Sequence, residues 1–292
     1  MDPVRRIADA VLYEGYVLWP YRKSALKNQR RWTFGGVYPP AHSAAHPDDP
    51  PLMRAECLAL SDSIDVSVRF LHVVRRQVLD DRGEPVDELD GFVTWDEATE
   101  REATDSIAIE AGSTRETFPG GAVERSWREL RGSVEVRSVP IDGVRRVSVT
   151  VKNETPWTGP DREDALRQTF CSTHMVLRGE FASLTGPPDE LRDAAAACEN
   201  IGCWPVLVGD RTTMLCSPII LEDYPQIAPE SPGDLFDGGE IDQLLILNIL
   251  ALTDEEKREM RASDPRAREI LERTENLSED ELMRLHGAIR ER

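Results

Sequence analysis

Apolar residues recur along this chain with two different periods, and the change of period separates the expected elements. Residues 4–12 have apolar side chains at helical spacing, between Pro3 and Gly15, which predicts a short N-terminal helix. From about residue 52 the period becomes two, and residues 64–79 are expected to form one long strand with a single buried face. The first half of the chain is therefore expected to be mainly β-structure.

Alternating runs on both sides of short turn sequences predict two hairpins. The first covers residues 133–151 and turns at the Asp-Gly dipeptide 142–143, which favours the positive φ of a tight turn. Its first arm changes apolar phase, which predicts a bulge near Arg137 and Ser138. The second hairpin covers residues 204–221 and turns at a Gly-Asp pair. Both hairpins indicate antiparallel sheets.

Helical patterns follow between and after these strands. Residues 159–170 and 189–202 are expected to form short helices, and the chain from residue 240 onward is expected to be wholly helical. Three helix starts in this last part are specified locally, by two capping boxes and by a cap followed by a first-turn proline. The residues concerned are Thr253 with Glu256, Ser278 with Glu281, and Asp264 with Pro265.

These elements predict an α+β protein with a β-rich antiparallel body, inserted short helices and a helical C-terminal module. The body is expected over residues 1–221, including the N-terminal helix. An acidic connector rich in proline and glycine follows at 222–239, and the helical module occupies 240–292.

Charge restricts the classes of partner. The net charge of −19 repels phosphate, so nucleic acid is not expected as a partner. No segment reaches the roughly 18 apolar residues of a membrane helix, and the N-terminus lacks a signal-peptide pattern, so we expect no membrane insertion and a cytoplasmic location. The first 36 residues nevertheless carry seven bases against three acids. This segregated charge suggests a surface for binding.

The basic aromatic segment, residues 21–32, is the first candidate surface. Arginine with tryptophan or tyrosine is the composition found at protein–protein hot spots. The same guanidinium groups could bind a small phosphate or carboxylate, or could clamp the segment onto the chain's own acidic surface. The candidate partner- or anion-binding residues are Arg22, Lys23, Lys27, Arg30, Arg31 and Trp32.

The second candidate surface is the acidic connector together with the apolar helix that follows it. Residues 222–242 contain seven acids, three prolines and three glycines, but no Lys or Arg. Their spacing does not match an EF-hand loop, so a connector or docking segment is preferred over a metal site. The sequence 241–252 is apolar almost all round, which requires burial on several sides, in this chain or against another protein.

Evidence for catalysis is weak, and we expect no cofactor. The chain has no glycine-rich phosphate loop, no GxSxG elbow and no HExxH helix. A metal-handling protein or a Cys/His-based enzyme is the competing hypothesis, and it requires scattered thiols to converge around an imidazole. The candidates are Cys171, His174, Cys198, Cys203 and Cys216, for which buried free cysteines are the simpler interpretation.

Several long motifs resemble an uncharacterised bacterial protein family associated with gene neighbourhoods of nickel-iron uptake hydrogenases. They are VLYEGYVLWPYRKSALKNQRRWTFGGVYP, GCWPVLVG, SPIILEDYPQIAPESPGDLFDGGEID and LTDEEKREMRASDPRAREILERTE. The family has no established activity, so the resemblance transfers no catalytic residue. It implies a non-enzymatic accessory or assembly factor whose protein partner is a hydrogenase subunit or maturation factor. A small-anion-binding β module is the further alternative.

Overall fold

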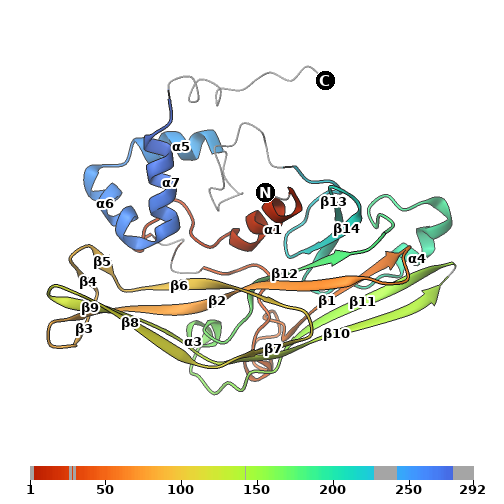
Figure 1. Cartoon of the computed structure of the whole chain (residues 1–292), viewed down its shortest axis with the longest axis horizontal. Coiled ribbons are helices and arrows are strands. Elements are labelled where there is room, and N and C mark those ends of the chain that lie inside the picture. The colour runs from red at the N-terminus through yellow and green to blue at the C-terminus, as the bar shows by residue number, and fades with distance from the viewer. Residues whose placement is uncertain (1–2, 26–27, 29–30, 142, 227–241, 279–292) are drawn as a thin grey trace.

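The computed structural model describes residues 3–25, 28, 31–141, 143–226 and 242–278. It confirms the predicted α+β class, with antiparallel sheets, short inserted helices and a helical C-terminal part. Figure 1 shows α1 and the C-terminal helices on one side of the long strands, which run the length of the molecule.

The strands of the described residues form a four-stranded sheet, a larger sheet and a small hairpin. The four-stranded sheet has the order β1-β11-β10-β7, and the larger one has the order β13-β14-β12-β2-β9-β8, with β3 and β6 also paired to β2. The bounds are β1 Leu52–Ala59, β2 Asp65–Asp80, β3 Pro85–Val86, β4 Glu88–Leu89, β5 Phe92–Val93, β6 Trp95–Ala103, β7 Ser106–Ile109, β8 Gly112–Phe118, β9 Gly121–Trp127, β10 Leu130–Ile141, β11 Val144–Asn153, β12 Cys171–Arg178, β13 Trp204–Val208 and β14 Asp210–Ser217.

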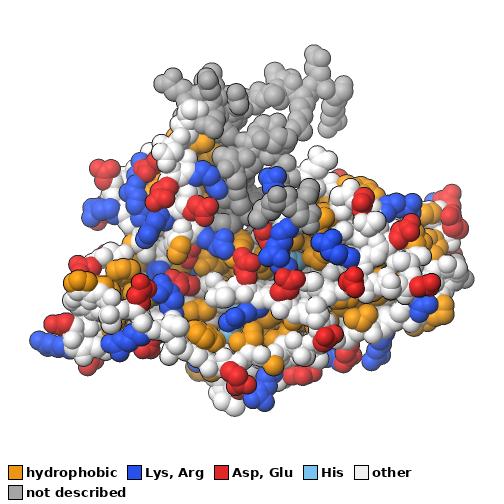
Figure 2. Space-filling view, in the orientation of Figure 1, with side chains coloured by type: hydrophobic (Ala, Val, Ile, Leu, Met, Phe, Trp, Pro, Cys, Tyr) orange, Lys and Arg blue, Asp and Glu red, His pale blue; other side chains and the backbone are white. Residues whose placement is uncertain are grey.

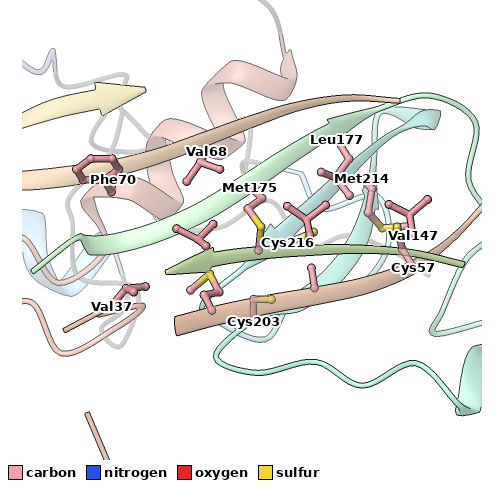
Figure 3. Packing of buried hydrophobic residues seen from close by; sticks show 14 of the residues in the cluster. Val37, Cys57, Val68, Phe70, Val147, Met175, Leu177, Cys203, Met214 and Cys216 are labelled. Carbon is pink, nitrogen blue, oxygen red and sulfur yellow. The ribbon is translucent and has the colours of Figure 1, made fainter. Parts of the chain in front are cut away.

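The main core lies between the two larger sheets. Alternate residues of β1 and β11, such as Ala55 and Val149, meet Phe70 of β2 and Met175 of β12 there. Figure 3 shows this cluster, in which thiols and thioethers pack among aliphatic side chains. Because successive residues of a strand point to opposite faces, each sheet contributes one apolar face to this core.

Strand β2 is buried on both faces over much of its length, so the expectation of a single buried face was wrong. Val68 and Phe70 belong to the core between the sheets, whereas Leu71 and Val73 pack under the helices. The long apolar run of this strand has its physical reason in this double burial.

Helices cover that outer face. α1 packs on β12, β14 and β2, and α5, α6 and α7 share a second core with the N-terminal segment. The helices are α1 Pro3–Tyr13, α2 Pro40–Ser43, α3 Arg162–Leu166, α4 Arg192–Ala196, α5 Asp242–Leu250, α6 Asp254–Ser263 and α7 Pro265–Glu275, with a 3-10 turn at Asp189–Leu191. The two short helices predicted at 159–170 and 189–202 are present as α3 and α4, and both end well before the predicted positions.

Both predicted hairpins are present, but the predicted bulge at Arg137 and Ser138 is absent. β10 and β11 pair in one continuous register from Gly132 opposite Asn153 to Ile141 opposite Val144. The phase change instead leaves Val136 and Val139 exposed on opposite faces of the hairpin.

The local signals for the C-terminal helices are confirmed where the structure describes them. Thr253 and Glu256 form a reciprocal capping box at the start of α6, and Asp264 caps α7 ahead of Pro265. The box predicted at Ser278 and most of the acidic connector involve residues outside the described ranges. None of the helices that the structure describes has both the length and the apolar character needed to cross a bilayer.

Candidate functional site

The start of the basic aromatic segment lies against helix α6. Arg22 Nη1 is 3.1 Å from a carboxylate oxygen of Glu256 and 3.7 Å from one of Glu259. The backbone amide of Ser24 donates to Glu259, and that of Lys23 donates to the Ser263 hydroxyl. These contacts correspond to the internal clamp considered from the sequence. Lys27 and Arg30 lie outside the described residues.

The end of the basic aromatic segment is buried. The Arg31 guanidinium carbon lies 4.2 Å from the ring centroid of Trp32 and 3.7 Å from that of Trp95, and the group donates to the Asp96 carbonyl. Burial lowers the pKa of Arg31 to about 10, an effect opposed by nearby Tyr16 and by the acids around it. Arg31 and Trp32 are therefore held inside the protein and are not presented to a partner.

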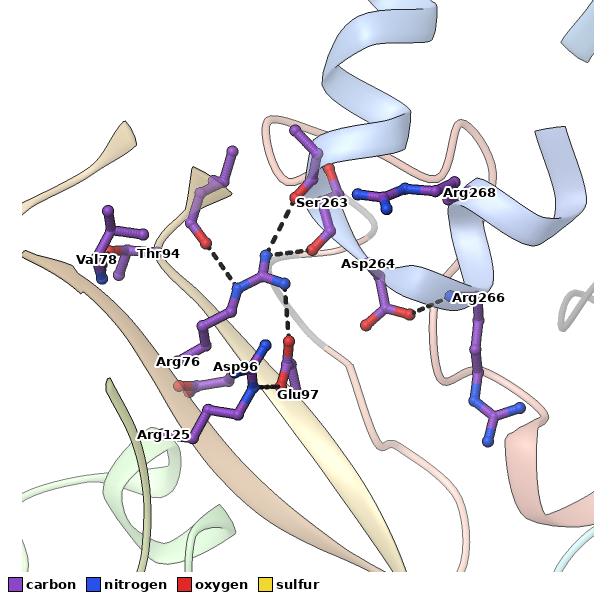
Figure 4. A network of polar contacts seen from close by, with 12 residues as sticks. Arg76, Val78, Thr94, Asp96, Glu97, Arg125, Ser263, Asp264, Arg266 and Arg268 are labelled. Carbon is purple, nitrogen blue, oxygen red and sulfur yellow. Dashed lines mark hydrogen bonds and ion pairs between the residues drawn. The ribbon is translucent and has the colours of Figure 1, made fainter. Parts of the chain in front are cut away.

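A polar network fixes the α6–α7 junction to the sheet (Figure 4). Arg76 of β2 donates to the Ser263 carbonyl at 2.5 Å and to the Ala262 carbonyl at 3.2 Å, and pairs with Glu97 at 2.7 Å. At the start of α7, Asp264 accepts from the buried Tyr16 hydroxyl at 2.8 Å. The C-terminal helices thus pack on the body through specific charged contacts as well as apolar ones.

The thiols do not converge on His174. Cys203 and Cys216 lie with Cys57 in the core between the sheets, whereas Cys171 belongs to the core under the helices. Among the described residues no group of three or more His, Cys, Asp or Glu side chains has the geometry to hold a metal ion.

Burial also keeps the thiols protonated and the imidazole neutral. It raises the pKa of Cys171 and of Cys203 to about 12, and that of the partly buried Cys198 to about 11, so these thiols stay protonated at neutral pH. Burial, with a contribution from nearby Arg69, lowers the pKa of His174 to about 3. A buried neutral imidazole and separate protonated thiols are typical of core residues.

The described beginning of the acidic connector is tied to the sheet edge. Asp223 accepts hydrogen bonds from Ser183, Thr185 and the Leu207 amide at 2.5 to 2.8 Å. The Tyr224 amide then donates to the Leu207 carbonyl. Asp223 thus attaches the start of the connector to edge strand β13.

Helix α5 has apolar side chains on two faces. Leu245, Ile246 and Ile249 are buried in the core under the helices. On the outer face Leu244 is 50% exposed and Leu247 is 44% exposed, one helical turn apart. These two leucines form the outer face of α5.

Charged residues do not segregate on the face shown in Figure 2, where basic and acidic side chains are interspersed around the helices and strands. Arg5 of the basic N-terminal region, for example, lies 3.2 Å from Asp9 and 3.5 Å from Glu102. Sequence reasoning also missed Arg69, which is buried on β2 and pairs with Asp9 at 2.6 Å. The available signal was an arginine flanked directly by apolar residues, Val68 and Phe70, in this strand.

Comparison with protein-family models and with curated proteins found no match for this chain.

Proposed function

We propose that this protein is a non-enzymatic accessory factor that binds a protein partner through the outer face of helix α5. Of the two surfaces suggested by the sequence, the basic aromatic segment makes internal contacts wherever it is described, which leaves the apolar helix as the better candidate.

The exposure of Leu244 and Leu247 is the observation that carries this proposal. Apolar residues spaced along one helix face can insert into a groove on another protein, and the buried opposite face holds the helix rigidly for this purpose. Complete burial of both leucines would stabilise a complex by about 1 kcal/mol each, given that each is already about half buried.

Charge defines the partner further. The sequence from 222 to 242, which leads into α5, carries seven acids and no base. We therefore propose an apolar groove bordered by Lys and Arg on the partner, since opposite charges accelerate the encounter. The resemblance described above supports a cytoplasmic nickel-iron hydrogenase subunit, or one of its maturation factors, as the protein that carries this groove.

A metal-handling or Cys/His-based enzyme has less support. It would need a thiolate or a basic imidazole in an accessible position, whereas the candidate thiols are mostly buried and His174 is neutral and buried.

Co-purification tests the proposal. The tagged protein would be co-expressed with the hydrogenase structural and maturation genes, as wild type and as the Leu244→Ser/Leu247→Ser double variant. The matched control is Val136→Ser/Val139→Ser, which removes comparably exposed apolar side chains from the distant β10–β11 hairpin. We expect recovery of the hydrogenase component to fall at least about tenfold for the leucine variant only.

Equal recovery with the leucine variant and the wild type would refute α5 as the contact. Absence of every hydrogenase component from the wild-type preparation would refute this partner. Melting temperatures of both variants would show that they are folded.

A further inference from the structure

A cavity lies beside edge strand β13 and the start of β14, which are labelled in Figure 1. Its volume is about 470 Å³, and it is open to solvent. The wall is formed by the loop 183–188, by residues of β13 and β14, and by Asp223 and Tyr224 at the start of the connector. This size suits a small organic ligand.

Tyr224 places an exposed aromatic side chain on this wall. It is 44% exposed, and its backbone has a φ of +60°, a left-handed conformation that is unfavourable for a bulky residue. Two hydrogen bonds to β13 hold the chain in this conformation, since the Tyr224 amide donates to the Leu207 carbonyl at 2.7 Å and the Leu207 amide donates to Asp223 at 2.8 Å. Strained residues that their surroundings hold in place are concentrated at ligand-binding sites, so this fixed ring is suited to be a platform for a ligand.

The acceptors of the wall are also held in place by hydrogen bonds. Asp223 accepts from the Ser183 hydroxyl at 2.5 Å and from the Thr185 hydroxyl at 2.7 Å. The Ser183 oxygen in turn accepts from the Gly186 amide at 2.8 Å. A hydroxyl oxygen has two lone pairs and a carboxylate has about four, so Thr185 and Asp223 keep acceptor capacity after these contacts. The wall therefore offers fixed acceptors to a ligand that carries donors.

Arg211 supplies donors to the same cavity. It is exposed, and its guanidinium makes no ion pair or hydrogen bond with the residues that the structure describes. The wall thus has one base and one acid, and because the partners of Asp223 are hydroxyls and an amide, no further charge enters this balance. A wall without net charge favours a neutral ligand, since the carboxylate repels an anion and the guanidinium repels a cation.

We infer that this cavity binds a neutral pyranose sugar, with one face of its ring against Tyr224. Its hydroxyls bond to Arg211, Thr185 and Asp223. Sugar hydroxyls both donate and accept, so they match a wall that offers donors and acceptors side by side. The C–H groups on one face of a pyranose match the partial negative charge on the face of an aromatic ring. The site is separate from the outer face of α5 and does not depend on the proposed function.

The test is a calorimetric titration of the full-length protein with glucose, galactose and mannose. Each sugar is compared with its open-chain alditol, which has hydroxyls but no ring face, and with its uronate, which adds one negative charge. We expect saturable binding of at least one sugar, with binding of its alditol about 3- to 10-fold weaker, the worth of an aromatic contact. The uronate should also bind more weakly than the neutral sugar.

Variants of the wall assign the binding to this cavity. Tyr224→Ala should weaken binding of that sugar about 3- to 10-fold, whereas Tyr224→Phe, which keeps the ring, should change it less than about twofold. Arg211→Gln should weaken it about 3- to 10-fold through lost hydrogen bonds. The matched control is Arg137→Gln, an exposed arginine on the distant β10 strand, which should leave binding unchanged.

The inference is overturned if none of the three sugars shows saturable binding at about 50 mM. It is equally overturned if Tyr224→Ala and Arg211→Gln bind the sugar as the wild type does, or if the alditol binds as well as the sugar. Tighter binding of a uronate than of its neutral sugar would overturn the assigned ligand class.

Discussion

Replacement of Arg76 by methionine should detach the C-terminal helices from the sheet. This guanidinium donates to the last two carbonyls of α6, on Ala262 and Ser263, and to the Val93 carbonyl, and it pairs with Glu97. The carbonyls at a helix C-terminus have no partner within the helix and carry partial negative charge, so they are good acceptors for a buried cation.

The expected loss follows from these contacts. Arg76 is 6% exposed, and breaking a buried charge pair by removing one partner costs about 3–5 kcal/mol. Glu97 keeps its second partner, Arg125, at 2.9 Å, which places Arg76→Met near the middle of that range, at about 4 kcal/mol. Methionine retains much of the apolar contact, so the loss reports mainly on the polar network.

The assay is urea unfolding followed by tryptophan fluorescence, combined with hydrogen exchange of the α6 amides. Arg125→Met is the matched control: it removes the more exposed partner of the same carboxylate, for which a loss of about 1 kcal/mol is expected. In Arg76→Met the amides of α6 should exchange faster than those of β2, because the helices lose their attachment first. The reasoning is refuted if the two variants lose equal stability or if exchange in α6 is unchanged.

Three other predictions concern the body of the protein. The free energy of unfolding should fall as the pH is lowered from about 6.5 towards 4. Burial is the main cause of the low pKa values of His174 and His72, about 3 and about 4, so the unfolded chain takes up protons first. A pH series of urea unfolding should show a slope of up to about 1.4 kcal/mol per pH unit for each histidine, which is reduced in His72→Gln, and a flat profile would contradict this. Gly35→Ala should lower the free energy of unfolding by about 2–3 kcal/mol, since φ is +56° and a Cβ would lie 2.7 Å from a proline side chain. Gly83→Ala, at positive φ in open space, should lower it by about 1 kcal/mol. Thermal unfolding measures both variants, and equal losses would refute the packing argument. Mass spectrometry after brief iodoacetamide treatment at pH 8 should find Cys198 labelled first and slowly, with the four buried thiols protected, and early labelling of any other cysteine would contradict the assigned burial.

The fold class was predictable because it depends on local signals. The two hairpins have turn dipeptides with the required backbone freedom, and the caps at Thr253 and Asp264 act within three residues. Strand β6 was missed because its sequence, WDEATEREA, is mostly charged. Its carboxylates form ion pairs with arginines on other elements.

The roles of the basic residues could not be predicted, because their partners are distant in sequence. Arg22 pairs with acids more than 230 residues away, and Arg31 stacks on Trp95. The sequence shows a basic aromatic segment but not whether other parts of the chain neutralise it. The same limit applies to Arg69, whose unpaired nitrogen is visible only once α1 packs over β2.

Site-specific photo-crosslinking tests the central claim most directly. A benzophenone amino acid would be placed at Leu247 on the outer face of α5, at Val139 on the far hairpin as control, and at Lys23 in the basic aromatic segment. Each protein would be irradiated in cells that express the nickel-iron hydrogenase genes. The account predicts a crosslink to a hydrogenase subunit or maturation factor from position 247 alone. A crosslink to such a protein from position 23 or 139, with none from 247, would contradict it.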